Sequence, residues 1–253
     1  MDTHCHFDDQ SFDPDRLQIL HQMQGLGVSD LIIPAITQAS WVGVQTLCLD
    51  QVRLHAAYGL HPIYLAEHTE QHLTELGDFI RENRSQVIAV GECGLDFFLP
   101  DLDVQRQTEL FIMQLKLAKR YDLPVIIHAR RSVDAVLSCI RRIGGLRGVV
   151  HSFAGSLQQA EQFITQGFYL GAGGTLTYER AQRLRHVLKT VPLESLLLET
   201  DAPDQPDSLW RGQRNTPLRL PVIAAALAQL RGCPVESIAK ITTTNAQNLF
   251  GIS

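Results

Sequence analysis

The stretch Val87–Glu92 (VIAVGE) is a run of apolar residues closed by a carboxylate. Apolar runs closed by a polar residue recur in Pro124–His128 (PVIIH) and in Leu196–Asp201 (LLLETD). Short apolar runs of this kind are typical of strands that are buried on both faces, as in a parallel sheet. A polar residue that closes such a run is expected at the carboxyl end of its strand, where parallel α/β folds build their active sites.

The rest of the chain alternates between similar runs and amphipathic, helix-like stretches. The predicted strands are Asp2–His6, Leu31–Ile36, Ala56–His61, Val87–Glu92, Val125–His128, Val149–His151, Phe168–Gly171 and Leu196–Asp201. The predicted helices include Pro14–Gly25, Gln71–Asn83, Val104–Tyr121, Val133–Ile143, Ser156–Gln166, Arg180–Leu188, Pro217–Leu230 and Pro234–Phe250. Eight strand–helix units in 253 residues favour a closed (β/α)8 barrel, the TIM-barrel fold, over an open doubly wound sheet. Because no linker or repeat interrupts the pattern, we expect one domain spanning residues 1–253.

Composition restricts the function classes. The chain is 45% apolar and 19% charged, which is typical of a globular protein, and its formal net charge is -5. The negative charge provides no global attraction to nucleic acid and argues against high-affinity duplex binding. The five cysteines show no CxxC spacing, as is usual in a reducing compartment. With no long apolar run, we expect a cytoplasmic protein that uses no membrane, and we infer no obligate protein partner.

Histidines and carboxylates cluster at the ends of the predicted strands. His4 and His6 form an HxH pair, whose spacing of two places both imidazoles on one face of a strand. In a barrel, the carboxyl ends of all strands converge on one face, so residues distant in sequence meet there. The candidate metal ligands are His4, His6, Glu92, His128, His151 and Asp201. Six imidazole and carboxylate ligands suit two divalent cations per subunit, such as Zn, Mg or Mn.

We expect Glu92 to bridge the two cations. One cation would then bind His4, His6 and Asp201, and the other would bind His128 and His151. Two ions about 3.5–4 Å apart can hold a nucleophilic water and clamp the oxygens of an in-line displacement. Asp201 could take the proton from that water as a general base, provided that its second oxygen is free. Asp201 and Glu92 are therefore the predicted catalytic residues.

Six motifs occur in order along essentially the whole chain. They are MDTHCHFD (1–8), GLHP (59–62), GECGLDFF (91–98), VIIHAR (125–130), VVHSFAGS (149–156) and LLLETDAPD (196–204). This set resembles the TatD-type metal-dependent deoxyribonucleases, and most closely their YjjV-like branch. The resemblance implies a barrel fold, divalent cations and phosphodiester hydrolysis in DNA. It places the first cation on His4, His6, Glu92 and Asp201, the second on Glu92, His128 and His151, and His61 beside the substrate phosphate.

Four residues are candidates for contact with substrate. His61 ends a predicted strand, although its position before Pro62 also suits a residue that caps a turn. Arg130, with Arg131, and Arg214 follow ligands in sequence and could bind flanking phosphates, or they could be ordinary surface arginines. Asn215, in the motif RNTP (214–217), could contact substrate or order its loop.

Two further groups have open roles. Glu199 shares the inward face of its strand with Asp201 and could accept the free N–H of a ligand histidine, or form an ion pair deeper in the barrel. His68 and His72 are one helical turn apart, but they lie in the polar stretch EHTEQH (67–72), for which we expect a solvated helix start.

Three function classes remain. The first is a metal-dependent deoxyribonuclease that acts on single-stranded ends, since a pocket at a barrel mouth suits a strand end better than a duplex. The second is a carboxyl-ester or amide hydrolase for a small substrate or an aminoacyl ester, because the same cations polarise a carbonyl. The third is a metal-stabilised binding module, which predicts that Asp201→Asn leaves function intact when metal is retained.

Overall fold

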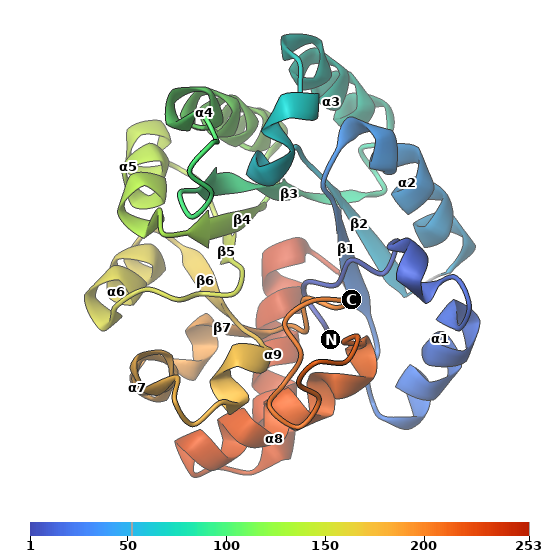
Figure 1. The fold of residues 1–253 in the computed structure, drawn as a ribbon, viewed down its shortest axis with the longest axis vertical. Helices are drawn as coiled ribbons and strands as arrows, with labels where there is room; N and C mark the ends of the chain where they lie inside the picture. The colour runs from blue at the N-terminus through green and yellow to red at the C-terminus, as the bar shows by residue number, and fades with distance from the viewer. Residues whose placement is uncertain (52, 253) are drawn as a thin grey trace.

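The computed structural model of the chain describes residues 1–51 and 53–252. Its strands lie in the centre and run parallel, and a ring of helices surrounds them (Figure 1). Within these residues, seven strands pair side by side in sequence order: β1 (Leu31–Ala35), β2 (Leu54–Tyr58), β3 (Val87–Asp96), β4 (Val125–Arg130), β5 (Gly148–Val150), β6 (Phe168–Ala172) and β7 (Leu196–Leu198).

A helix follows each strand, as the sequence pattern predicts. The helices are α1 (Arg16–Gly25), α2 (Trp41–Asp50), α3 (Glu70–Glu82), α4 (Val104–Tyr121), α5 (Val133–Ile143), α6 (Leu157–Thr165), α7 (Gln182–Thr190), α8 (Leu220–Arg231) and α9 (Val235–Phe250). Short 3-10 helices lie in the connections: η1 (Gln10–Phe12), η2 (Gln38–Ser40), η3 (Pro62–Glu67), η4 (Gly174–Thr177), η5 (Leu193–Ser195) and η6 (Pro217–Arg219). This alternation confirms the predicted (β/α)8 fold class.

The predicted first strand, Asp2–His6, is not a regular strand, which corrects the sequence prediction. It makes one bridge, between Asp2 and Leu31, after which its backbone leaves the register of β1. A parallel ladder would next use the amide of residue 34, but Pro34 has no N–H to donate. The amide of Cys5, instead of that of His4, donates to the carbonyl oxygen of Ile32 at 3.1 Å.

The segment nevertheless closes the barrel, because it hydrogen-bonds to both neighbours. Towards β1, the amide of Ile32 donates to the Asp2 carbonyl oxygen at 2.9 Å. Towards β7, the amide of Thr3 donates to the carbonyl oxygen of Leu198 at 3.0 Å, and the amide of Asp201 donates to that of His4 at 2.8 Å. Residues 2–6 therefore occupy the position of the eighth strand and bring His4 and Asp201 side by side.

One end of the barrel is closed by α9, which passes behind the strands in Figure 1. Apolar side chains from the strands pack there against Ala246, Leu249 and Phe250 of α9; the strand residues are Ile32, Ala57, Ala89, Ile126, Val149 and Leu197. The polar cluster predicted from the sequence is thereby restricted to the opposite end, at the carboxyl ends of the strands.

The strand ends that differ most from their predicted positions are those of β2, β7 and β3. β2 ends at Tyr58, so that His61 lies on the following loop and caps the start of η3. β7 ends at Leu198, and Asp201 has a left-handed φ of 57°, which a strand does not accommodate. β3 instead continues beyond Glu92 to Asp96, which pairs with Arg130 of β4.

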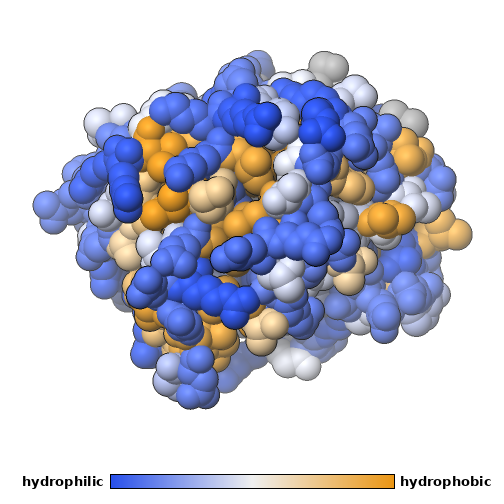
Figure 2. Space-filling model, turned by 90° about the horizontal axis from the view of Figure 1, so that it is seen from above, coloured by the Kyte–Doolittle hydropathy of each residue, from blue (hydrophilic) through white to orange (hydrophobic). Residues whose placement is uncertain are grey.

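The outside of the helix ring is mostly hydrophilic, with apolar residues in small groups between polar ones on the face shown in Figure 2. Among the described residues, no single helix is long and apolar enough to cross a membrane. Pro217–Arg231 and Val235–Phe250 meet the length and composition criteria only as a pair bent by 110°.

Candidate metal centre

The barrel fold brings all six predicted ligands together at one end. Two come from the N-terminal segment, two from within β3 and β4, and two from the loops that follow β5 and β7: His4, His6, Glu92, His128, His151 and Asp201. The cluster lies beside a cavity of roughly 1470 Å³, lined by His6, Glu92, His128, His151 and Asp201 among others.

Glu92 is at the centre of the cluster, and its two carboxylate oxygens face different histidines. Oε2 lies 3.1 Å from Nε2 of His4 and 3.5 Å from Nε2 of His6. Oε1 lies 2.9 Å from Nε2 of His151 and 3.1 Å from Nδ1 of His128. The carboxylate thus divides the histidines into the two groups that the sequence analysis expects.

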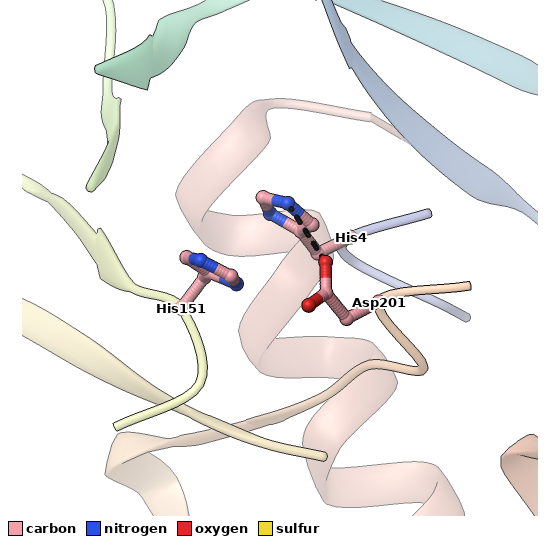
Figure 3. A group of neighbouring side chains, drawn as sticks. All are labelled: His4, His151 and Asp201. Atoms are coloured by element: carbon pink, nitrogen blue, oxygen red, sulfur yellow. Dashed lines mark ion pairs between the residues drawn. The ribbon is translucent and has the colours of Figure 1, made fainter. Parts of the chain in front are cut away.

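Asp201 joins the group on the Oε2 side. Its Oδ1 atom lies 3.5 Å from Nε2 of His4 and 3.7 Å from Nε2 of His6. Figure 3 shows the carboxylate turned towards His4, with the ring of His151 beside it. The rings of His4 and His151 stack with centroids 4.0 Å apart, so the two groups are in contact.

The donor set fits divalent cations. Nε2 of His4 is 3.4 Å from Nε2 of His6, and Nδ1 of His128 is 3.3 Å from Nε2 of His151. Imidazole nitrogens that face one another at such distances need a proton or a cation between them. Three groups in the cluster have donor atoms close enough to share an ion: His4 with His151 and Asp201, His4 with His6 and Glu92, and His61 with Glu92 and His128. Imidazole and carboxylate together are the ligands of Zn, Mn and related cations.

The electrostatics of the cluster favour an anionic carboxylate among histidines of mixed charge. Burial alone raises the pKa of Glu92, but His61, His151 and His4 outweigh this and hold it well below its usual range. Burial, with the neighbouring charge of His151, lowers the pKa of His4 to about 4. Burial opposes protonation of His6 also, but Glu92 and Asp201 raise its pKa to about 9. Glu92 is therefore ionised, as a ligand must be.

His61 lies closer to the cluster than a substrate contact alone requires. Its Nε2 atom is 3.1 Å from Oε1 of Glu92, and its Nδ1 atom accepts the amide of Ile63 at 3.2 Å. The carbonyl oxygen of His61 accepts a hydrogen bond from Nε2 of His68 at 2.9 Å. His68 is buried, so the expected solvated helix start is wrong for this residue. The hydrogen bond from His68 to the His61 carbonyl oxygen accounts for this position and holds the loop that contains His61.

Asp96 is a buried residue of the site that sequence reasoning missed. Its Oδ2 atom accepts a hydrogen bond from Nε2 of His128 at 3.0 Å, and its Oδ1 atom accepts the amide of Phe98 at 2.8 Å. A donor–acceptor pair of this kind fixes the tautomer of a ligand histidine. The signal available in the sequence was the aspartate of GLDFF (94–98), four residues after Glu92.

Glu199 is fully buried beside His151. Its Oε1 atom accepts the amide of Ser152 at 2.5 Å and lies 3.8 Å from Nδ1 of His151. Burial raises the pKa of Glu199 to about 8, although the charge of His151 and the Ser152 amide act against this. Gly171 provides the space, since a Cβ there would lie 2.3 Å from Oε2 of Glu199. Glu199 thus lies beside His151, although the 3.8 Å separation is longer than a direct hydrogen bond.

The second oxygen of Asp201 is occupied by a hydrogen bond. Oδ2 accepts from Nε2 of Gln205 at 2.5 Å, and the same nitrogen lies 2.7 Å from Oγ of Ser152. The condition that this oxygen be free is therefore not met in full. A carboxylate oxygen carries two lone pairs, so one remains for another donor.

The candidate substrate contacts separate into two pairs. His61 and Arg130 line the cavity, whereas Arg214 and Asn215 do not. Both oxygens of Asp15 bind the guanidinium of Arg214, at 3.0 and 2.5 Å. Asn215 is buried, and its amide donates to the carbonyl oxygens of Thr200 and Asp204 at 2.8 and 2.7 Å. These two residues order the chain after β7 and do not reach the cavity.

Comparison with known proteins identifies the family. The sequence profile described as TatD related DNase matches residues 1–251. The chain belongs to the TatD-related DNase family. It is 44% identical to YjjV of Escherichia coli K12, a protein described as an uncharacterised metal-dependent hydrolase, over all of this chain and 98% of that one. The fold matches the crystal structure of the same YjjV with a TM-score of 0.95 at 43% identity, over 100% of this chain and 98% of that chain.

A further relative has a more specific description. The chain is 34% identical to a Rahnella sp. protein described as the 3'-5' ssDNA/RNA exonuclease TatD, over 96% of this chain and 94% of that one. Membership of the family and the donor cluster together make this chain a metal-dependent hydrolase. The predicted family resemblance is confirmed.

Proposed function

We propose that this hydrolase cleaves phosphodiester bonds in single-stranded DNA, starting at strand ends. The observation that carries the proposal is the division of ligands by Glu92, whose two oxygens face separate groups of histidines. A centre of this kind suits in-line displacement at phosphorus. The description of the Rahnella relative as a single-strand exonuclease supports the same substrate class.

We propose that the cluster holds two divalent cations. His4, His6 and Asp201, with Oε2 of Glu92, would hold one cation, and His128 and His151, with Oε1 of Glu92, would hold the other. Bound cations of this kind supply Lewis acidity, which polarises a phosphoryl oxygen and lowers the pKa of water. The protein's own contribution is to hold the donors in place, to orient the substrate and to accept a proton.

Asp201 is the proposed proton acceptor. Its Oδ1 atom faces His4, while Oδ2 receives the Gln205 amide and keeps one lone pair for a proton. Glu92 stays anionic and orients both groups of histidines. His61 would contact the scissile phosphate, because its Nε2 atom points at Glu92 where the cavity meets the cluster. Arg130, at the rim of the same cavity, would contact a flanking phosphate.

The direct test uses end-labelled single-stranded DNA and protein loaded with Zn, Mn or Mg. Stepwise shortening that requires added metal and is abolished in Asp201→Asn would support the proposal and reveal the polarity of attack. Cleavage of carboxyl esters or cyclic amides without cleavage of DNA, by protein shown to hold its metal, would replace it with the second hydrolase class. Binding of DNA without cleavage, unchanged in metal-loaded Asp201→Asn, would favour a binding module.

We also propose that residues 1–253 form one domain in the cytoplasm. The terminal amine of Met1 donates to Oγ1 of Thr243 in α9 at 3.4 Å, which ties the start of the chain to its last helix. All five cysteines are free, as is usual in a reducing compartment.

A further inference from the structure

The arginines of this protein differ in whether their guanidinium groups have partners. Most form an ion pair or a hydrogen bond with a carboxylate, amide or carbonyl oxygen. Within residues 1–51 and 53–252, those with neither are Arg120, Arg130, Arg131, Arg142, Arg180, Arg183 and Arg211. Four of these line the one cavity beside the metal centre: Arg130, Arg131, Arg180 and Arg183. Unpaired cations are thus concentrated at the site.

The four arginines come from two neighbouring parts of the barrel mouth. Arg130 ends β4 and Arg131 follows it, whereas Arg180 precedes α7 by two residues and Arg183 lies in the first turn of α7. The first turn of α7 has no side-chain cap, so its amides add to the positive potential there. We call these four residues the arginine wall. Asp134 lies on the same side of the cavity, but its Oδ1 atom already accepts from Gln159 at 2.7 Å.

Phe98 holds part of the arginine wall in position. The guanidinium carbon of Arg130 lies 3.7 Å from the centroid of the Phe98 ring, and that of Arg131 lies 4.7 Å from it. Phe98 itself is 41% exposed and lines the cavity. Stacking on an aromatic ring orients a guanidinium without using its N–H donors. Those donors therefore remain available to a ligand.

Two other carboxylates at the rim lie on a different arc of the mouth from the arginine wall. Asp9 follows the N-terminal segment and Asp204 follows β7, and both line the cavity. A polyanion that enters the cavity is therefore attracted along the side of β4 to β6 and repelled from the side of β7 and the N-terminal segment.

We infer that the arginine wall is the track for the backbone of a single-stranded polynucleotide, with Arg180 and Arg183 binding phosphates beyond the scissile bond. This inference rests on the proposed nuclease function and adds the direction in which the strand leaves the metal centre. Guanidinium groups bind phosphates through paired N–H donors, and a flexible single strand can follow a curved wall that a duplex cannot.

The test compares Arg180→Gln/Arg183→Gln with a matched control, Arg120→Gln/Arg142→Gln. The control pair likewise forms no ion pair or hydrogen bond among the described residues, but it lies near the carboxyl ends of α4 and α5, outside the cavity. Three quantities are measured with metal-loaded protein. They are KM on labelled oligothymidylates of increasing length, the salt dependence of KM, and kcat/KM on bis(p-nitrophenyl) phosphate, which has no flanking phosphates.

We expect the Arg180/Arg183 variant to raise KM on long oligonucleotides by roughly tenfold and to abolish the decrease of KM with length. The slope of log KM against log salt should fall by about 0.7 for each phosphate that the variant no longer binds. Cleavage of the small diester and all properties of the control should stay at wild-type values. Unchanged KM and salt slope in the variant, with oligonucleotides still cleaved, would overturn the arginine wall and leave the nuclease intact. Wild-type protein that cleaves no oligonucleotide would instead overturn the proposed function itself.

Discussion

Nε2 of His128 lies 3.0 Å from Oδ2 of Asp96, and this hydrogen bond decides which nitrogen of the ring faces the metal centre. Because Asp96 accepts from Nε2, Nδ1 is the ring nitrogen that faces Oε1 of Glu92, 3.1 Å away, and the one that could bind a cation. Asp96 also accepts the amide of Phe98, on which Arg130 stacks. One buried carboxylate thus supports both a candidate ligand and the arginine wall.

Asp96→Asn should weaken metal binding by about 10–100-fold, as is usual when the partner of a ligand histidine is removed. The amide of the variant can donate to Nε2, which favours the wrong tautomer. Metal affinity is measured by competition with a chromogenic chelator, with Asp50→Asn, an exposed carboxylate outside the site, as control. Affinity equal to that of the control would show that Asp96 does not position His128.

Two glycine substitutions should distinguish a loss of folding stability from a loss of metal affinity. A Cβ at Gly94 would lie 2.0 Å from the backbone oxygen of His128, and φ there is +150°, so Gly94→Ala should cost about 1–3 kcal/mol or more in unfolding free energy. The atoms nearest to a Cβ at Gly171 belong to the carboxylate group of Glu199, which is the end of a flexible side chain. The Gly171→Ala variant should therefore keep most of the wild-type unfolding free energy. It should bind metal more weakly, because a displaced Glu199 would disturb the neighbouring His151. Urea unfolding measures the unfolding free energy, and chelator competition measures the metal affinity. Equal losses of both quantities in the two variants would contradict the roles given to Gly94 and Gly171.

Stability should depend on the protonation of His68. Burial lowers its pKa, so the native state keeps it neutral, while the unfolded chain takes up a proton below about pH 6.5. The stabilisation is present above that pH and is lost as the pH falls through the lower native pKa. His68→Gln cannot titrate, and its unfolding free energy should fall less between neutral and mildly acidic pH. Chemical unfolding of both metal-free proteins gives the difference, and equal slopes would refute the buried, neutral state.

Arg214 and Asn215 should affect stability and not substrate binding. Asn215→Ala removes three side-chain hydrogen bonds, one of them fully buried, and should cost about 1–3 kcal/mol. Arg214→Gln breaks a partly exposed ion pair with Asp15 and should cost less than about 1 kcal/mol. KM on oligonucleotides should stay at the wild-type value in Arg214→Gln. A rise in KM at unchanged stability would return Arg214 to the substrate contacts.

The sequence predicted the cluster of candidate ligands because most of them close an apolar run, and parallel strands bring such ends together. The sequence-based prediction failed where local backbone geometry or tertiary contacts determine the structure. The missing amide of Pro34 interrupts the first strand, and the left-handed backbone of Asp201 ends the last strand early. Gln205 and Arg183 follow no strand directly, so hydrophobic periodicity contains no information about their side chains. His68 lies in a polar stretch, and only the tertiary contact with His61 explains its burial.

The most direct test of the central claim is anomalous diffraction from crystals loaded with Zn or Mn, collected for the wild type and for Glu92→Gln. Two cations that share Glu92 predict two anomalous peaks in the wild type, about 3.5–4 Å apart, one near each carboxylate oxygen. At least one peak should disappear in the variant. A single peak in the wild type, or two peaks that persist unchanged without the Glu92 carboxylate, would contradict a centre bridged by this residue.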